Sequence, residues 1–419
     1  MATLERISPT SFSISERNGE LNYEELKRPI SAKLSQIFWA DGSAWREANL
    51  WAFDRGGSGE IDNKTIDSNI GNLTNYANFL ESQSIFWFSF PTRKADRCLV
   101  RYRGWLIGER DQGRLSPGTA SEYMRTAIAF YRWILSRGLL EMDAPLWRDS
   151  PVYIRYFDAH GFERMLFRVS ADLAIPNRKR HGIRLEGGLL PLSNEDRDSI
   201  LDFSMGNAPP EIHLMLSLGF FTGMRIGSIS DLKIETLHNA VPDPMAKGLF
   251  RISLGPGASP AVHTKYGVTG SILIPQALLE SLLIYVQSIR RSRRQILALR
   301  EDRDLVFLTR HGNPYCRRAS ERTTAINTAM ADLRLAGKKA GIKALSNFRF
   351  HQSRCTFATE VATIAIQSGD PVNAIGLVRE LLLHSTEATS YGYIKFATQT
   401  PMKVALANEF MRAFSGLEK

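Results

Sequence analysis

The stretch FHQSRCTFAT, residues 350–359, places a histidine and an arginine three positions apart. It runs on into TFATEVATIAI, residues 356–366, whose composition predicts a helix. On a helix, residues three apart lie about 60° apart around the axis, so His351 and Arg354 share one face and can reach one phosphate. The HxxR spacing occurs by chance in a chain of this length, so its meaning depends on the residues that accompany it.

Two segments upstream supply further cations. In TGMRIGSISDLK, residues 222–233, Gly223 allows a tight turn after an apolar helix and Arg225 opens the next helix. A guanidinium suits an oxyanion because its planar fork donates two parallel hydrogen bonds and keeps its charge. In HTKYGVTGSILIP, residues 263–275, Lys265 stands beside Gly267 on a turn between two β segments, where we expect it to be mobile. Taken alone, each cation is better explained as a surface residue.

The segment LLLHSTEATSYGYI, residues 381–394, contains His384 and two tyrosines. Tyr391 and Tyr393 differ by two positions, about 200° around a helix, so they cannot face the same phosphate. A phenol is a weak nucleophile at neutral pH because its pKa is about 10. Two arginines and a lysine nearby are expected to favour the oxyanion and to stabilise a pentavalent transition state. Taken alone, a tyrosine here is explained as a half-buried packing residue.

Together the four segments resemble the catalytic signature of the tyrosine recombinases, the phage-integrase family, which has the pattern TGxR…K…HxxR…(L)GH…Y. The nucleophile of that family follows the last histidine by nine residues, which selects Tyr393 over Tyr391. The resemblance implies an enzyme that cuts and rejoins DNA through a 3′-phosphotyrosine link and a free 5′-hydroxyl. It implies that neither a metal nor ATP is needed, because the bond energy is kept in the covalent link.

The resemblance also implies a role for each residue of the set. Arg225, Arg354 and His384 would hold the scissile phosphate. His351 would assist proton transfer at the nucleophile, and Lys265 would protonate the leaving 5′-oxygen.

Four positions near this set depart from the family pattern. Ser228 stands where many members have an acidic residue, and Leu383 where a glycine usually precedes the last histidine. Cys355 replaces a histidine after the second arginine, and Ser353 replaces a common leucine. These departures argue against close kinship with the common phage or Xer-like branches of the family. They argue less against the cleavage chemistry, because none of them changes one of the six catalytic positions.

The resemblance covers residues 190–395 and extends to 60–145, and it implies a mainly α fold with a small antiparallel β-sheet. A helical core-binding domain and a mixed α/β catalytic domain would together clamp duplex DNA. We expect an N-terminal extension over residues 1–60, which serves as an arm or a subunit contact, and the helical domain over 61–150. A basic linker or insertion over 151–190 is expected to lead to the catalytic domain over 191–395, and a tail helix to follow over 396–419.

Composition agrees with a polyanionic partner, because the 419-residue chain carries a net charge of +10 and has a pI near 9.5. The residues predicted to contact DNA phosphates belong to the helical domain and to the basic linker, and they are Arg125, Arg132, Arg178, Lys179 and Arg180. The three cysteines have no ligand or disulfide spacing, which favours reduced thiols. No signal or membrane-spanning pattern occurs, so we expect a cytoplasmic protein associated with the nucleoid.

Local patterns predict several elements outside these motifs. Apolar spacing predicts helices over 67–83, 98–110 and 116–138, the last with Ser116 as cap and Gly138 as stop. Ser193 is the expected cap where the second domain starts. Residues 249–255 and 270–275 form a predicted β insert, and 304–315 a short strand with a turn. The basic run RRSRR, residues 290–294, is explained by the helix dipole and solubility.

Our leading hypothesis is a site-specific recombinase that acts as a homo-tetramer on two DNA sites and is monomeric when free. The sequence does not distinguish integration, excision, transposition and resolution as the biological task. A type IB topoisomerase is the alternative enzyme, and a catalytically silent DNA-binding protein of the same fold is the alternative outside enzymes. A helical scaffold without a DNA role has the least support.

Overall fold

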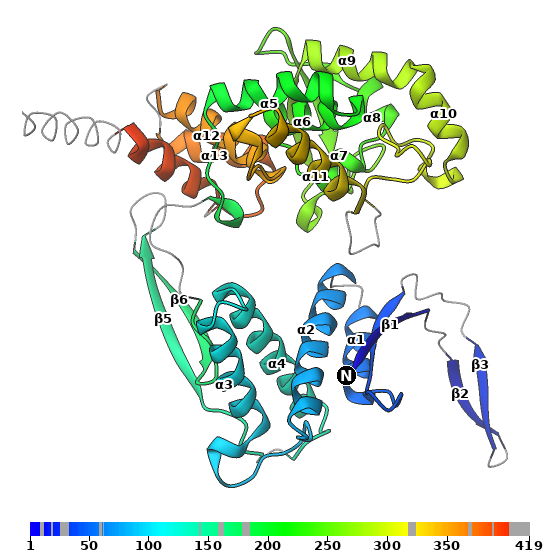
Figure 1. Cartoon of the computed structure of the whole chain (residues 1–419), viewed down its shortest axis with the longest axis vertical. Coiled ribbons are helices and arrows are strands. Elements are labelled where there is room, and N and C mark those ends of the chain that lie inside the picture. Colours follow the sequence, from blue (N-terminus) through cyan, green and yellow to red (C-terminus); the bar gives the residue numbers. More distant parts are fainter. Residues whose placement is uncertain are drawn as a thin grey trace, which may run out of the picture. The chain divides into compact units, whose positions relative to one another are not determined.

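The chain folds into two units, which are described separately below (Figure 1). Residues 1–157 and 163–181 make up the first, and residues 158–162 and 182–419 the second. The computed structural model describes residues 1–8, 12–17, 20–25, 33–57, 61, 63–141, 144–157, 163–177, 185–316, 324–367, 371–387 and 389–401.

Four helices dominate the first unit: α1 (Arg46–Gly57), α2 (Asn63–Ser82), α3 (Cys98–Asp111) and α4 (Pro117–Ser136). The last three confirm the predicted helices. The Ser116 side chain accepts a hydrogen bond from the backbone N–H of Thr119, with Pro117 in the first turn, which is the expected N-terminal cap. Gly138 follows α4 with a φ of 66°, a left-handed conformation that glycine adopts without strain and that ends a helix.

Aromatic side chains fill the core between these helices. Trp45 and Phe130 meet edge to face with ring centroids 5.3 Å apart, and the hydroxyl groups of Tyr76 and Tyr131 lie 2.9 Å apart. Ile37 belongs to the same buried cluster. The cluster therefore includes residues of the expected N-terminal extension, where β1 (Thr3–Ile7) pairs antiparallel with β4 (Leu34–Phe38).

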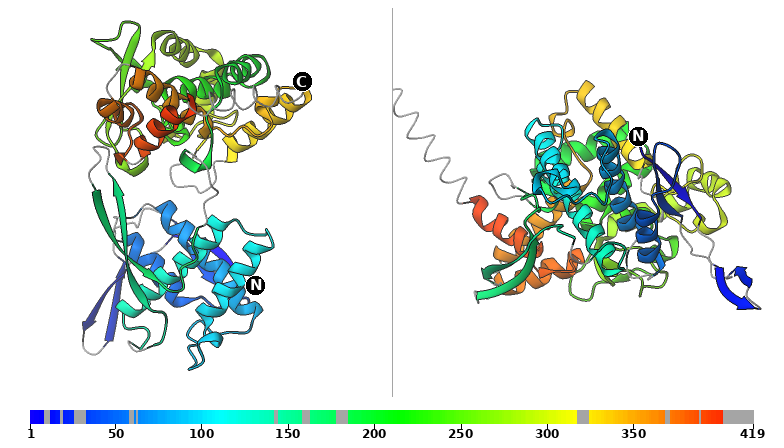
Figure 2. Two further views of the ribbon diagram at one scale, coloured as in Figure 1. Left: turned by 90° about the vertical axis from the view of Figure 1, so that its left-hand side faces the viewer. Right: turned by 90° about the horizontal axis from the view of Figure 1, so that it is seen from below.

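Two hairpins complete the described part of the first unit. Strand β2 (Phe12–Arg17) pairs with β3 (Glu20–Glu25), and β5 (Asp149–Phe157) pairs with β6 (Glu163–Ala171) to form a long ribbon (Figure 2). The second hairpin occupies much of the expected basic linker or insertion. Sequence reasoning missed this hairpin, although aromatic and β-branched residues are frequent there and a five-residue segment with Asp158 and Gly161 separates the two runs.

The second unit is mainly helical around a three-stranded antiparallel sheet. Its sheet has the order β7 (Val241–Pro242), β8 (Leu249–Leu254), β9 (Gly270–Pro275), which confirms the predicted β insert. Its helices are α5 (Asn194–Asn207), α6 (Pro210–Thr222), α7 (Ile226–Ser230), α8 (Ile234–His238), α9 (Gln276–Gln287), α10 (Ile289–Leu297), α11 (Thr324–Lys339), α12 (His351–Gln367) and α13 (Pro371–Leu382), and residues 389–401 are also helical.

Helix α6 lies at the centre of this unit. Ten of its 13 residues are buried, and it packs against α5, α12 and β9. Ser193 caps α5 by accepting a hydrogen bond from the backbone N–H of Asp196, as predicted. A helix that is apolar on all sides can be stable only inside a core, so α6 is a fixed element from which the following residues 223–225 project.

Two predictions in the second unit were wrong. Residues 304–315 contain the predicted turn at 309–313, but in place of the predicted strand they have only isolated bridges, such as Leu308 with Pro314. The basic run on α10 is not simply a solvated face, since Arg291 and Arg294 are buried. Arg291 donates hydrogen bonds to the backbone oxygens of Arg303 and Leu305, and Arg294 donates to that of Leu308, so these cations hold the loop.

The end of the chain is only partly described. Residues 389–401 are helical, and the predicted apolar face of the tail, which begins at Met402, lies outside the described residues. No described helix is both long enough and apolar enough to cross a membrane.

We predict that Gly223→Ala destabilises the second unit by about 2 kcal/mol or more. Gly223 has a φ of 66°, and an added Cβ would lie 2.5 Å from Phe357 and 2.7 Å from Leu382. The measurement is unfolding by denaturant, followed by far-UV circular dichroism. Gly206→Ala is the matched control, because that helical glycine has open space around it and should lose no stability. Equal midpoints for both variants would contradict the prediction.

Candidate active site

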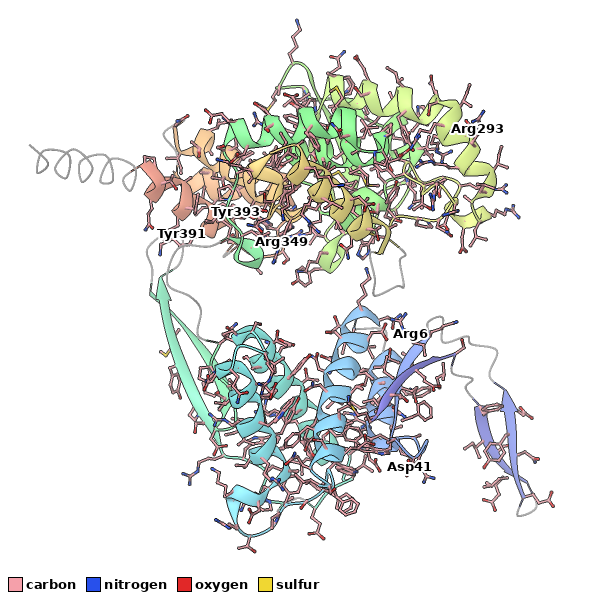
Figure 3. All side chains as sticks on the ribbon, viewed as in Figure 1. Arg6, Asp41, Arg293, Arg349, Tyr391 and Tyr393 are labelled. Carbon is pink, nitrogen blue, oxygen red and sulfur yellow. The ribbon has the colours of Figure 1, made fainter. Side chains whose placement is uncertain are left out.

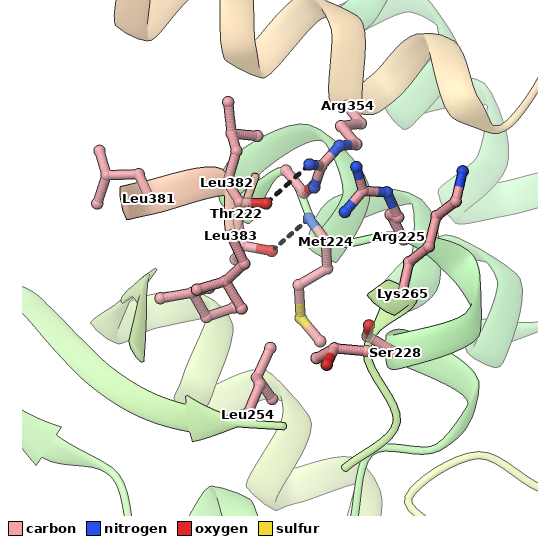
Figure 4. Close-up of a pocket in the computed structure, with 13 residues that line it drawn as sticks. Thr222, Met224, Arg225, Ser228, Leu254, Lys265, Arg354, Leu381, Leu382 and Leu383 are labelled. Carbon is pink, nitrogen blue, oxygen red and sulfur yellow. Dashed lines mark hydrogen bonds between the residues drawn. The ribbon is translucent and has the colours of Figure 1, made fainter. Parts of the chain in front are cut away.

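Arg225 owes its position to the end of α6. The left-handed Gly223 closes the helix, and the close approach of Phe357 and Leu382 leaves no room for a side chain there. The chain then turns so that Arg225 stands at the N-terminal cap of α7. Figure 4 shows its guanidinium beside that of Arg354 at one wall of a pocket of about 290 Å³.

Arg354 is held in a fixed orientation by the backbone. Its side chain is almost completely buried, and its two terminal nitrogens donate hydrogen bonds of 2.6 and 2.7 Å to the backbone oxygens of Gly223 and Leu382. Its Nε has no hydrogen-bond partner and lies 3.9 Å from a carboxylate oxygen of Glu186. Burial, together with the nearby charge of Arg225, lowers the pKa of Arg354 to about 10, so the group stays charged at neutral pH.

The two histidines reach the same carboxylate from different elements. His351, at the start of α12, has its Nε2 3.0 Å from Glu186 Oε2. His384 follows Leu383, which has a φ of 49° in the position where the family usually has glycine. The Nδ1 of His384 lies 2.9 Å from Ser390 Oγ, and its buried Nε2 lies 3.0 Å from Glu186 Oε1 without the geometry of a hydrogen bond.

Glu186 is the residue that sequence reasoning missed. It opens the short 3₁₀ turn η2 (Glu186–Gly188), and its carboxylate lies within 4 Å of four of the six predicted catalytic side chains, namely the two arginines and the two histidines, with Arg225 at 3.4 Å. Burial on its own would raise the pKa of Glu186. The proximity of His351, His384 and the two arginines outweighs that effect and holds the pKa of Glu186 far below its usual range. No motif or spacing in the sequence indicates this residue.

Tyr393 lies in the core of the second unit beside this group. Its hydroxyl is fully buried and donates a hydrogen bond to Cys355 Sγ at 3.7 Å, and its ring stacks on His384 at 5.8 Å. Burial, and then the proximity of Cys355, raises the pKa of Tyr393 well above the ordinary value. The expectation that nearby cations would favour the oxyanion is wrong for this conformation, because loss of water outweighs their attraction.

Tyr391 and Tyr393 have opposite environments on the same helix (Figure 3). Tyr391 is 46% exposed whereas Tyr393 is buried, as the predicted angle between them requires. His384 is also kept neutral near pH 7, since burial lowers the pKa of its imidazole. The expected nucleophile and the expected phosphate ligands are therefore close, but the nucleophile is covered.

Lys265 is on the rim of the same pocket. It belongs to η3 (Lys265–Gly267), a turn in which Tyr266 and Gly267 both have positive φ. Its exposed ammonium lies 4.9 Å from the centre of the Tyr266 ring. The pocket is lined by Lys265, Arg225 and Arg354 together, so the turn brings the lysine near the arginines without fixing it in contact with them.

The predicted DNA-binding residues are distributed differently. Arg125 is exposed and pairs with Glu122 on the same face of α4. Arg132 pairs with Asp149 at 2.7 Å and lies over the Trp147 ring. Both side chains are therefore already neutralised by acidic neighbours. The remaining three, Arg178, Lys179 and Arg180, lie outside the described residues. Within the described ranges, no group of His, Cys, Asp and Glu is arranged to hold a metal ion.

Comparison with solved structures identifies the fold. The chain has the fold of the integrases that contain a helical core-binding domain and a catalytic domain, as the resemblance implied. One match is a Tn1549 transposon integrase in complex with circular intermediate DNA, with a TM-score of 0.51 and 14% identity, covering 85% of this chain and 98% of that chain. A second complex of that integrase gives the same TM-score and identity over 83% and 94%. No protein-family profile and no curated protein sequence matches the chain.

We predict that alkylation of Cys355 in the native protein at pH 8 is slowed about a hundred-fold or more relative to the denatured chain. Burial raises the pKa of this thiol to about 11, and only the thiolate reacts. The rate can be measured with iodoacetamide and peptide mass spectrometry, with the less buried Cys316 as internal reference. Equal rates in the native and denatured states would contradict the prediction, because they would show that the buried surroundings of Cys355 and Tyr393 are open to solvent.

Proposed function

We propose that this protein is a site-specific DNA recombinase that forms a 3′-phosphotyrosine intermediate. The observation that carries the proposal is the convergence of Arg225, His351, Arg354 and His384 on one carboxylate. A carboxylate and a phosphate attract the same hydrogen-bond donors, so this anion marks the place for a scissile phosphodiester. The fold shared with DNA-bound integrases supports the same conclusion.

Each group has a chemical task in this proposal. The two arginines neutralise the phosphoryl oxygens as negative charge builds up in the transition state, and His384 donates a hydrogen bond to one of these oxygens. His351 accepts the proton of the attacking phenol. Lys265 moves from the rim of the pocket and donates a proton to the leaving 5′-oxygen, so that the DNA strand is cut while Tyr393 becomes linked to its 3′-phosphate. The reverse reaction, with a new 5′-hydroxyl, rejoins the strand without ATP or a metal ion.

The proposal requires Tyr393 to leave its present position. Its hydroxyl points to Cys355 and is buried, so it cannot attack a phosphate in this conformation. The tyrosine lies on the helix of residues 389–401, close to the end of the described chain. A shift of that helix would bring the phenol from beside His384 to the phosphate.

Double-stranded DNA is the proposed partner, and strand exchange requires a homo-tetramer on two sites. The net charge of +10 favours such a polyanion. The similar Tn1549 integrase has been solved with circular intermediate DNA and with transposon right end DNA. A role in integration, excision or transposition of a mobile element, at the nucleoid, follows from the proposal.

The decisive prediction concerns the nucleophile. Incubation with a nicked suicide substrate should trap a covalent protein–DNA adduct that survives SDS. Tyr393→Phe should abolish the adduct and keep DNA binding, because only the attacking oxygen is lost. Tyr391→Phe is the matched control and should form the adduct normally. The reverse pattern would disprove the assignment.

A second prediction tests Lys265 as the general acid. Lys265→Ala should slow adduct formation by about a thousand-fold on ordinary DNA. The loss should largely disappear with a 5′-bridging sulfur at the cleaved bond, because a thiolate leaves without protonation. Lys247→Ala, at another exposed lysine, should have no effect on either substrate. Equal defects on both substrates would exclude this role.

The alternatives predict different results. A type IB topoisomerase would relax any supercoiled plasmid as a monomer and without sequence preference. A silent DNA-binding protein would bind with a steep salt dependence but give no adduct.

A further inference from the structure

We propose that Leu185–Leu189 is an autoinhibitory strap whose Glu186 occupies the place of the scissile phosphate and keeps the site closed until DNA displaces it. This inference rests on the proposed function, since it concerns the regulation of the same site. Three independent features carry it: the contacts of the carboxylate, the incomplete hydrogen bonding around it, and the packing of Leu185.

The first feature is that a phosphate and the Glu186 carboxylate exclude each other. The carboxylate contacts the same two arginines and two histidines that the phosphate would need. Two anions within about 4 Å repel strongly in a site with little water, so neither can remain when the other is bound. Glu186 therefore has to leave the site before a strand can be cut.

The second feature is that Glu186 fits the site incompletely. The Nε–H of Arg354 is buried and has no hydrogen-bond partner, although it faces the carboxylate at 3.9 Å, and the Nε2 of His384 lies 3.0 Å from the carboxylate without hydrogen-bond geometry. A buried donor without a partner is costly. A phosphodiester has two non-bridging oxygens and two ester oxygens in a tetrahedral arrangement, whereas a carboxylate has two oxygens in one plane. A DNA phosphate can satisfy donors that Glu186 leaves unpaired, and this gives the substrate the advantage in the exchange.

The third feature couples the strap to the nucleophile. Leu185 is buried in the same apolar cluster as Cys355 and Tyr393, and Leu189 packs against that cluster. The Cys355 thiol also lies 4.0 Å from the backbone oxygen of Glu186. Withdrawal of the strap thus removes the competing anion and uncovers part of the cluster that buries the phenol.

The strap is built to be displaced as one piece. It is a single short turn, closed by hydrogen bonds from the Leu185 backbone N–H to the Leu189 oxygen and from the Gly188 N–H to the Leu185 oxygen. Beyond it, α12 fixes the chain, because the Gln352 side chain donates to the Leu190 oxygen and the Leu192 N–H donates to Thr356 Oγ1. Residues 190–192 can therefore remain in place while the turn opens.

The strap also stands next to the boundary between the two units. The first unit ends at His181, only five residues before Glu186. Binding of a DNA phosphate to the second unit is the proposed signal that withdraws the strap.

A first test measures the anion site without DNA. We expect inorganic phosphate to raise the midpoint of thermal unfolding of Glu186→Gln by several degrees and to leave the wild type almost unchanged. Glu195→Gln, which removes the charge of an exposed neighbour, should behave as the wild type. Equal stabilisation of all three proteins would overturn the proposal. Circular dichroism would verify that each variant is folded, and Glu186→Ala provides a second variant with the same expected response.

A second test measures relief of inhibition on the suicide substrate. At limiting DNA, Glu186→Gln should form the Tyr393 adduct about ten-fold faster than the wild type and than Glu195→Gln. A slower adduct, or loss of phosphate binding, would show that Glu186 helps to build the site and would overturn the strap. If no protein forms an adduct while phosphate still distinguishes Glu186→Gln, the proposed function fails and the occupied anion site stands.

Discussion

The second unit depends on one side chain that joins three distant segments. The guanidinium of Arg354, on α12, donates hydrogen bonds to the backbone oxygen of Gly223 after α6 and to that of Leu382 at the end of α13. Through these two hydrogen bonds, the terminal nitrogens of Arg354 hold α12 against the chain that follows α6 and against the end of α13. Because they fix the plane of the guanidinium, they also fix the direction of its Nε–H, and Nε lies 3.9 Å from the Glu186 carboxylate in the anion site.

Gathering these cations has an electrostatic consequence. Arg354 is buried beside Arg225, and burial, followed by the nearby charge of Arg225, lowers the pKa of Arg354. A buried group of this kind requires an anion. In this conformation Glu186 supplies it, and the very low pKa of its carboxyl shows how strongly the site favours negative charge. The same attraction is what a phosphodiester would use.

Sequence reasoning predicted the parts of this arrangement with local causes. Helices α2, α3 and α4, the Ser116 and Ser193 caps and the β insert all follow from periodicity or from short-range hydrogen bonding. The hairpin of β5 and β6 was missed although its strands are neighbours in the sequence, and the burial of Arg291 was missed because the solvation of a charge depends on groups outside its own helix. Glu186 was missed for the same reason.

The sequence by itself determined which side chains are available: it selected Arg225, His351, Arg354, His384 and Tyr393 by their order and spacing, which local geometry and family resemblance can read. Only the tertiary structure decided where these side chains lie, how deeply they are buried and which charged groups they contact. It brought four of them to one point, placed Glu186 among them and buried Tyr393 against Cys355. The physical reason is that burial and charge pairing depend on the whole surroundings of a group, which no window of sequence contains.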